Sequence, residues 1–129
     1  MTTQHRDAAL SPSEQATIRQ LLDADRQRTE TRIAVLGHDR DEMIQSAAQS
    51  ASDDEHDPEG TSTAFERAHI EALLDQAQTH LVDLDLAVER LHDGTYGICA
   101  KCGQRIAIER LMILPAAKMC VGCAAHHRH

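Results

Sequence analysis

Residues 96–104 read YGICAKCGQ and place Cys99 and Cys102 three positions apart, with two residues between them. A second pair, Cys120 and Cys123, follows in the stretch CVGC, and the chain has four cysteines in all. Each Cys-x2-Cys unit lets one backbone turn present two thiolates to a single ion, and the 17 residues between the pairs let the chain return. Four thiolates complete the tetrahedral shell of zinc. The spacing therefore predicts one structural Zn²⁺ per chain, in a zinc finger at residues 95–124.

The cysteine spacing also admits an iron–sulfur cluster or a redox-active dithiol, and zinc is the favoured interpretation. A zinc ion with four protein ligands has no open position for water, so the predicted site is not catalytic. Metal binding would stabilise this module directly, because few apolar residues surround it. Four thiolates and one zinc ion carry a formal charge of about −2, which nearby cations offset: Lys101, Arg105, Arg110 and Lys118.

Charge is distributed unevenly along the 129 residues, whose net charge is −8. Residues 1–98 hold 20 acidic and 8 basic side chains, giving −12, whereas residues 99–129 hold 1 and 5, giving +4. An acidic body argues against non-specific binding to duplex DNA, because phosphate contacts need cations. The start of the chain has no apolar signal core, and no apolar run approaches the length of a membrane span. We therefore expect a cytoplasmic protein without a membrane segment, in a compartment where thiols stay reduced.

The first long helix is predicted to begin at residue 12. Ser11, Pro12 and Glu14 match a capping box with proline at the first helical position. The apolar seam that follows is imperfect, and Gly37 interrupts it at a cost of ~1 kcal/mol relative to alanine. One heptad line of this seam contains Leu22, Thr29, Leu36 and Met43.

The second helix has the strongest periodicity in the chain. Its heptad lines contain Ile70, Ala77, Leu84 and Leu91, and Leu74, Leu81 and Val88. This pattern is typical of a coiled coil over about three heptads. Thr63 and Glu66 fit a capping box at its start, and Gly94 fits a left-handed cap at its end.

These patterns predict a mainly α fold: a long antiparallel coiled-coil helical hairpin, followed by the small four-cysteine module with a short C-terminal helix. The boundaries are a flexible N-terminus at 1–11, the hairpin at 12–94 with an acidic tip loop at about 49–62, the zinc finger at 95–124, and a tail at 125–129. We expect a monomer. Four apolar residues between the cysteine pairs are expected to pack on the hairpin: Ile106, Ile108, Leu111 and Ile113.

The run from Asp93 to Cys123 resembles the signature of the TraR/DksA zinc-finger family. The matching residues are Tyr96, Gly97, Ile106, Arg110, Leu111 and Pro115, together with the four cysteines. The resemblance extends over residues 12–123 when the hairpin is included. It implies a non-enzymatic regulator that binds bacterial RNA polymerase, inserts its hairpin tip into the secondary channel and alters initiation without reading DNA sequence.

Two departures from the family pattern concern the tip and an effector. Relatives carry Asp-x-x-Asp-x-Ala at the tip, whereas this chain has Asp57 followed by Gly60 and Ser62 at that spacing. The tip candidates for contact with the polymerase active centre are Asp53, Asp54, Asp57 and Glu59, and the alternative is that these acids only solvate a loop. Leu114 replaces an arginine that helps some members hold ppGpp, and Asp83 lies on the facing helix. Dependence on ppGpp is therefore not carried over.

Two other functions remain open at this point. One is a zinc ribbon that contacts nucleic acid, or polymerase, through Lys101, Arg105, Arg110 and Lys118, although Tyr96 is the only tyrosine and gives no stacking platform. The other is a thiol-based zinc or redox sensor, in which cysteine oxidation releases the metal.

Overall fold

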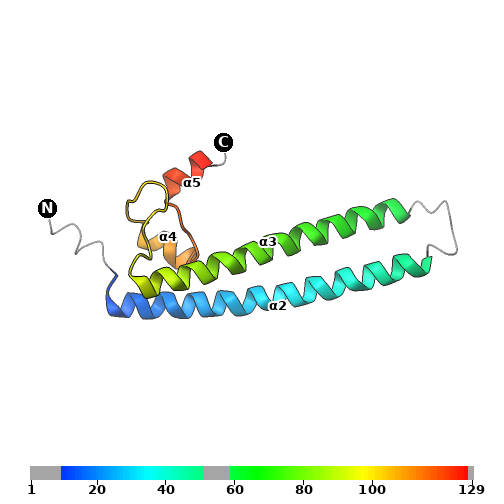
Figure 1. Cartoon of the computed structure of the whole chain (residues 1–129), viewed down its shortest axis with the longest axis horizontal. Coiled ribbons are helices and arrows are strands. Elements are labelled where there is room, and N and C mark those ends of the chain that lie inside the picture. The colour runs from blue at the N-terminus through cyan, green and yellow to red at the C-terminus, as the bar shows by residue number, and fades with distance from the viewer. Residues whose placement is uncertain (1–9, 51–58, 128–129) are drawn as a thin grey trace. The chain divides into compact units, whose positions relative to one another are not determined.

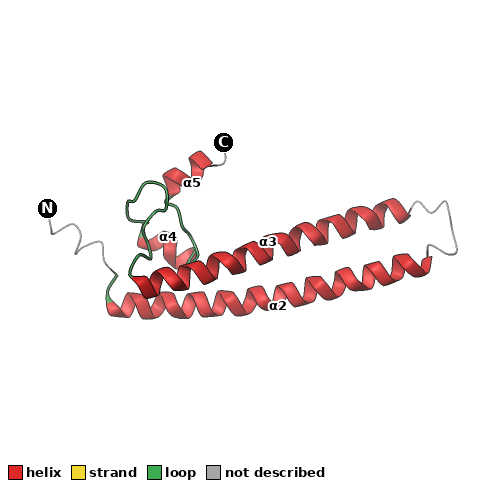
Figure 2. Cartoon of the chain, in the orientation of Figure 1, coloured by secondary structure: helices red, strands yellow, loops and turns green. Residues whose placement is uncertain are grey.

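A computed structural model describes residues 10–50 and 59–127 of the chain. The described residues form four helices: α2 (Pro12–Ser50), α3 (Glu59–Asp93), α4 (Ile108–Ile113) and α5 (Val121–His127) (Figures 1 and 2). Within these ranges there is no strand, and the one sheet-like contact is an isolated antiparallel bridge between Ile98 and Arg105. The predicted fold class is confirmed: a long antiparallel helix pair precedes a small four-cysteine module.

Helix α2 begins where the capping signals predict. The Ser11 hydroxyl accepts a hydrogen bond from the Glu14 backbone N–H at 3.1 Å, and the Glu14 carboxylate accepts one from the Ser11 N–H at 2.9 Å. This reciprocal pair satisfies two N–H groups that a helix start leaves without partners. The helix then continues through Gly37 to Ser50, beyond the predicted start of the tip loop.

Helix α3 begins earlier than the sequence patterns predicted. Its first residue is Glu59, so Thr63 and Glu66 lie inside the helix and do not cap it. Pro58 precedes this start in the sequence, and proline is favoured at the beginning of a helix because it lacks a donor that would be unpaired there. Residues 59–62, which were predicted as part of the tip loop, are therefore helical.

The end of α3 follows the prediction. Gly94 has a φ of 83°, in the left-handed region that favours glycine. The N–H of Thr95 donates to the carbonyl of Arg90 at 2.9 Å, which is the long hydrogen bond of a Schellman cap. This cap turns the chain directly from α3 into the zinc module.

The chain divides into two compact units, to each of which both long helices contribute. We call the described residues 10–26 and 82–127 the zinc-bearing unit, and the described residues 27–50 and 59–81 the arm unit. In the zinc-bearing unit, Arg26 of α2 pairs with Asp85 of α3. The core of this unit comprises Ile18, Leu22, Leu84, Ala87, Tyr96, Cys99, Ile106 and Leu111.

The arm unit has a sparse core. Its buried residues are Thr29, Leu74 and Ala77, while Leu36, Met43, Ile70 and Leu73 are half-buried. The heptad lines of the two helices therefore face inward, but they exclude water less completely than those of a continuous coiled coil.

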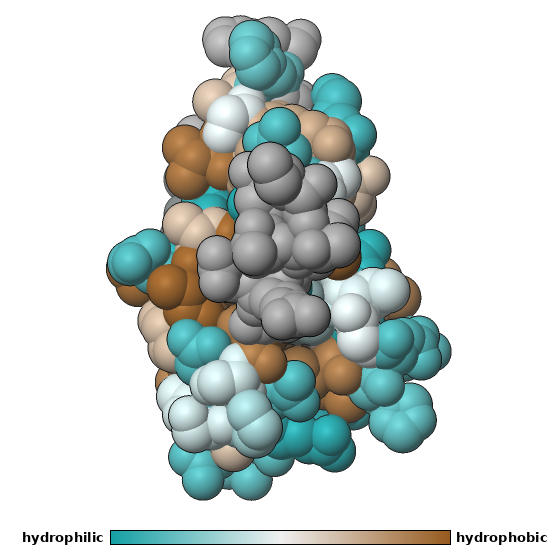
Figure 3. All heavy atoms as spheres, turned by 90° about the vertical axis from the view of Figure 1, so that its left-hand side faces the viewer, coloured by the Kyte–Doolittle hydropathy of each residue, from teal (hydrophilic) through white to brown (hydrophobic). Residues whose placement is uncertain are grey.

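Apolar surface stays exposed on the zinc-bearing unit. Ile106 and Leu111 are buried as expected, but Ile113 is 78% exposed and does not pack on the hairpin. It is the last residue of the one-and-a-half-turn helix α4, on a different face from Leu111. Figure 3 shows apolar patches beside polar ones on the face that is turned to the viewer.

Candidate metal centre

The first cysteine pair lies in a tight turn closed by backbone hydrogen bonds. The Cys99 N–H donates to Gln104 O at 2.8 Å, and the Gly103 N–H donates to Cys99 O at 2.9 Å. Gly103 has a φ of 75°, which a side chain would disfavour. The turn buries Cys99 and leaves Cys102 exposed.

Tyr96 and Gly97 attach this turn to the rest of the unit. The buried Tyr96 hydroxyl donates to the carbonyl of Pro115 at 2.6 Å, and the Tyr96 carbonyl accepts from Arg105 at 3.2 Å. Gly97 has a φ of 83°, and a Cβ there would lie 3.2 Å from the Arg105 guanidinium and 3.4 Å from Leu111. The Tyr-Gly dipeptide therefore joins the end of α3 to both halves of the module and leaves room for the arginine.

The second cysteine pair lies at the start of α5. The Cys123 N–H points to the Cys120 sulfur at 3.5 Å, and the Ala124 N–H donates to Cys120 O at 2.9 Å. Gly122 lies within this helix and, unlike Gly103 in the first turn, has no left-handed backbone. A helix start places N–H groups around the Cys120 sulfur without a second glycine turn.

The four sulfurs have the spacing that a tetrahedral metal requires. All four lie within 4.8 Å of one another, and those of Cys102 and Cys120 are 3.8 Å apart. Zinc–sulfur bonds of about 2.3 Å in a tetrahedron place neighbouring sulfurs ~3.8 Å apart. The donor set and its spacing therefore fit a structural zinc ion held by Cys99, Cys102, Cys120 and Cys123.

Backbone N–H groups favour the thiolate form at two of these cysteines. Hydrogen bonds from the backbone of Cys102 and then of Cys120 lower the pKa of Cys99 to about 6. The backbone of Cys123 is the main cause that lowers the pKa of Cys120. In contrast, the neighbouring sulfurs of Cys120 and Cys99 raise the pKa of Cys123 to about 12. Four thiolates this close repel one another, and a divalent cation offsets that repulsion.

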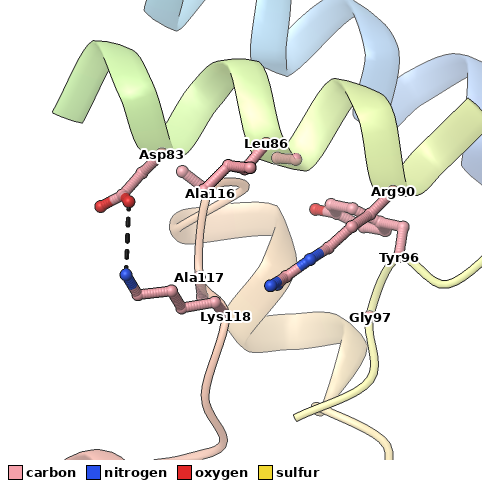
Figure 4. Close-up of a pocket in the computed structure, with 9 residues that line it drawn as sticks. Asp83, Leu86, Arg90, Tyr96, Gly97, Ala116, Ala117 and Lys118 are labelled. Atoms are coloured by element: carbon pink, nitrogen blue, oxygen red, sulfur yellow. Dashed lines mark hydrogen bonds and ion pairs between the residues drawn. The ribbon is translucent and has the colours of Figure 1, made fainter. Parts of the chain in front are cut away.

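Three of the four basic residues that were predicted to contact a partner make contacts within the zinc-bearing unit instead. Arg105 donates to Tyr96 O, Arg110 donates to Met119 O at 3.0 Å, and Lys118 pairs with Asp83 of α3 at 3.4 Å (Figure 4). Lys101 is exposed in the first turn. The two arginines satisfy carbonyls beside the cysteine turns, a structural role that charge counting along the sequence does not reveal.

The predicted tip residues are not placed by the structure. Asp53, Asp54 and Asp57 lie outside the described residues, and Glu59 is described only as the first position of α3. None of the helices within the described ranges has the length of continuous apolar sequence that would cross a bilayer.

The family comparison matches residues 94–129 to the prokaryotic dksA/traR C4-type zinc finger. This match contains the four cysteines and begins at the glycine that caps α3, and it confirms the resemblance seen in the sequence. The C4 description and the sulfur cluster together identify the metal as a structural zinc.

Relatives match parts of the chain. An uncharacterized protein of Aquifex aeolicus is 31% identical over 80 residues, which are 59% of this chain and 55% of that protein. General stress protein 16O of Bacillus subtilis is 44% identical over 45 residues, 35% of this chain and 28% of that protein. The matched stretch thus spans about half of the first relative and less than a third of the second.

A solved structure matches the fold over most of the chain. The structure of transcription factor DksA2 from Pseudomonas aeruginosa aligns with a TM-score of 0.71 and 24% identity, covering 92% of this chain and 85% of that one. The likeness includes the helical hairpin, which the family match at residues 94–129 does not reach.

Proposed function

We propose, from the premise that residues 94–129 belong to the dksA/traR C4-type zinc-finger family, that this protein is a non-catalytic transcription regulator that binds RNA polymerase. In this proposal the hairpin enters the secondary channel of the polymerase and brings its tip toward the active centre. The zinc module remains outside the channel and holds the protein on the enzyme. The observation that carries the proposal is the joining of a family zinc finger to a hairpin whose fold matches DksA2 over 92% of the chain.

The charge of the hairpin supports this proposal. The 98 residues before the first cysteine carry −12, and the acids include Asp53, Asp54, Asp57 and Glu59 at the tip. A polymerase active centre contains Mg²⁺ and its channel is basic, so an acidic arm is attracted to it over a long range. The zinc ion would fix the module's shape and take no part in chemistry.

Internal contacts of the basic residues favour polymerase over direct binding to nucleic acid. A protein that binds phosphates directs several cations outward, since each contact releases counterions. Here Arg105 and Arg110 donate to backbone carbonyls and Lys118 pairs with Asp83. Three of the four predicted contact residues are thus held by contacts within the zinc-bearing unit, which lowers the phosphate affinity expected of this set.

The ion pair between Lys118 and Asp83 also affects whether ppGpp could bind. Asp83 and Lys118 line a small pocket with Arg90 and Tyr96 (Figure 4). A carboxylate beside the lysine repels the phosphates of a nucleotide such as ppGpp, and Leu114 adds no charge. We therefore propose that the protein acts without ppGpp.

The experiment that tests this function is retention on immobilised core RNA polymerase, with and without a competitor known to fill the secondary channel. The competitor is expected to displace the protein. Retention that the competitor does not affect would place the binding surface elsewhere, and binding to DNA at the same salt concentration would favour the nucleic-acid alternative.

The role of the tip is tested separately in a transcription assay. Asp57→Asn keeps the size of the side chain and removes its charge, so polymerase binding is expected to persist while regulation weakens. Full regulation by an Asp54→Asn, Asp57→Asn, Glu59→Gln variant would mean that these acids only solvate the loop.

A further inference from the structure

An open groove lies between α2 and α3 within the arm unit. Its volume is about 450 Å³, inside the range of roughly 300–1,000 Å³ that is typical of ligand sites. Helix α2 contributes Asp39, Glu42 and Met43 to its walls, and α3 contributes Glu66 and Ile70. Residues of the second half of α2 thus face residues of the first half of α3, as antiparallel helices require.

The groove has an apolar floor and an acidic rim. Met43 and Ile70 are half-buried, whereas the carboxylate residues Asp39, Glu42 and Glu66 are exposed. Asp39, Met43 and Ser46 are spaced by three or four positions and so share one face of α2. A coiled-coil seam would fill this face with large apolar side chains, but here carboxylates occupy part of it.

Two arginines beside the groove pair with acids that do not line it. Arg40 pairs with Asp41 at 3.5 Å, and Arg67 pairs with Glu71 at 3.1 Å. The imidazole of His38 lies 3.3 Å from the carboxylate of Glu42, which is itself part of the rim. The groove therefore keeps a negative rim that attracts a cation from outside the chain.

We propose that this groove binds a lysine or arginine side chain of a basic segment that lines the polymerase secondary channel. Such a side chain has an aliphatic stem and a charged head. The stem would lie on Met43 and Ile70, and the head would lie among Asp39, Glu42 and Glu66. That the bound segment belongs to RNA polymerase rests on the proposed function. That the bound group is a cationic side chain rests on the residues that line the groove.

Other occupants fit the groove less well. In the part of the chain that the structure describes, the four cysteines are the one group of three or more ligand atoms close enough together for a metal ion. A nucleic acid backbone would be repelled by three carboxylates. An apolar segment would bury those carboxylates without partners, which is unfavourable.

The first test uses the full-length zinc-loaded chain and no polymerase. The chain has four methionines, Met1, Met43, Met112 and Met119, so ¹³C-methyl labelling gives few signals and Met43 reports the groove. We would titrate with acetyl-arginine amide and compare acetyl-citrulline amide, which has nearly the same shape but no charge. A saturable shift of Met43 with the arginine probe alone is expected, while Met112 and Met119 stay in place. No response of Met43, or equal responses to both probes, would overturn the proposal.

The second test compares two triple variants with the same change in charge. Asp39→Asn, Glu42→Gln, Glu66→Gln removes the rim, whereas Asp75→Asn, Glu89→Gln, Asp93→Asn removes exposed acids that do not line the groove. The rim variant is expected to lose the Met43 response and to bind polymerase about tenfold more weakly than the control variant, a change of ~1.4 kcal/mol. Circular dichroism would check that both variants remain helical.

The outcomes separate this proposal from the proposed function. If the unaltered chain fails to bind polymerase, the proposed function fails, and the polymerase as occupant fails with it, while a Met43 response would still support the chemistry of the groove. If the chain binds polymerase and both triple variants bind equally well, polymerase does not occupy the groove. In that case the proposed function stands and this inference is overturned.

Discussion

The zinc-bearing unit and the arm unit use the same pair of helices in different ways. In the zinc-bearing unit, Ile18, Leu22, Leu84 and Leu111 are at most 1% exposed and the Tyr96 hydroxyl bonds across the core. In the arm unit the heptad positions Met43 and Ile70 are half-buried and line an open groove. A metal and a dense core therefore stabilise one unit, whereas the other depends more on local helix formation.

Under the proposed function, this difference corresponds to two roles, an anchor and an inserted arm. A rigid module suits an anchor, because its geometry is fixed before it meets a partner and little order is lost on binding. A sparsely packed, acidic helix pair suits insertion into a basic channel, since its surface is complementary in charge.

Replacing Cys102 with serine tests the dependence of the zinc-bearing unit on its metal. Loss of one thiolate should abolish stoichiometric zinc binding, which in small zinc modules contributes on the order of 10–16 kcal/mol. Zinc content should fall well below one per chain, while far-ultraviolet circular dichroism keeps most of its helical signal because the heptads lie outside the module. A chelator added to the unaltered chain provides the control. Complete zinc retention by the variant would contradict the four-thiolate site.

Paired leucine truncations test the difference in packing. Leu84 is 1% exposed in the zinc-bearing unit, so Leu84→Ala is expected to lower the free energy of unfolding by ~2–5 kcal/mol. Leu73 of the arm unit is half-buried, so Leu73→Ala is expected to lower the free energy of unfolding by clearly less. Urea unfolding of both variants measures the two costs, and an equal loss would show that the arm is as well packed as the zinc-bearing unit.

Tyr96 gives a spectroscopic test of the core, because the chain has one tyrosine and no tryptophan. Burial raises the pKa of Tyr96 to about 12, against about 10 for an exposed tyrosine. The folded state holds the phenolic proton more tightly than the unfolded chain. Its contribution to stability is therefore complete below pH ~10 and is lost as the pH rises from about 10 to about 12. Phenolate absorbance should titrate near 12 in the folded protein and near 10 in denaturant, and a folded midpoint near 10 would mean that the hydroxyl is exposed.

Two glycine-to-alanine substitutions are expected to change stability in opposite directions. Gly37 lies inside α2, and a Cβ added there would meet nothing within 4 Å, so Gly37→Ala should raise helix stability by ~1 kcal/mol. Gly97 has a φ of 83° and little room beside Arg105, so Gly97→Ala should destabilise the zinc-bearing unit. Thermal unfolding followed by circular dichroism measures both, and a destabilising Gly37→Ala would mean that the arm needs that glycine.

Local signals of the sequence predicted much of this fold. The cysteine spacing, the Ser11–Glu14 capping box and the Gly94 cap each act through neighbours within a few residues, and the structure has all three. The start of α3 was predicted too late because Pro58 and Gly60 are found both in loops and near helix starts. The sequence offers no local signal that separates these two uses.

Contacts between distant residues were the part that the sequence could not give. Arg105 and Arg110 looked like surface cations, yet they donate to the carbonyls of Tyr96 and Met119. The Tyr96–Pro115 hydrogen bond and the exposure of Ile113 also depend on how the module folds back on α3. Periodicity assigned Met43 and Ile70 to a seam, but both are half-buried and line a groove together with carboxylate residues.

The most direct test of the proposed function is site-specific photo-crosslinking from residue 57 to RNA polymerase, with the zinc-loaded chain and its unaltered arm. The proposed function predicts crosslinks to polymerase segments that surround the catalytic Mg²⁺, and their loss when a competitor fills the secondary channel. Crosslinks confined to outer surfaces of the polymerase or to DNA, unaffected by that competitor, would contradict it.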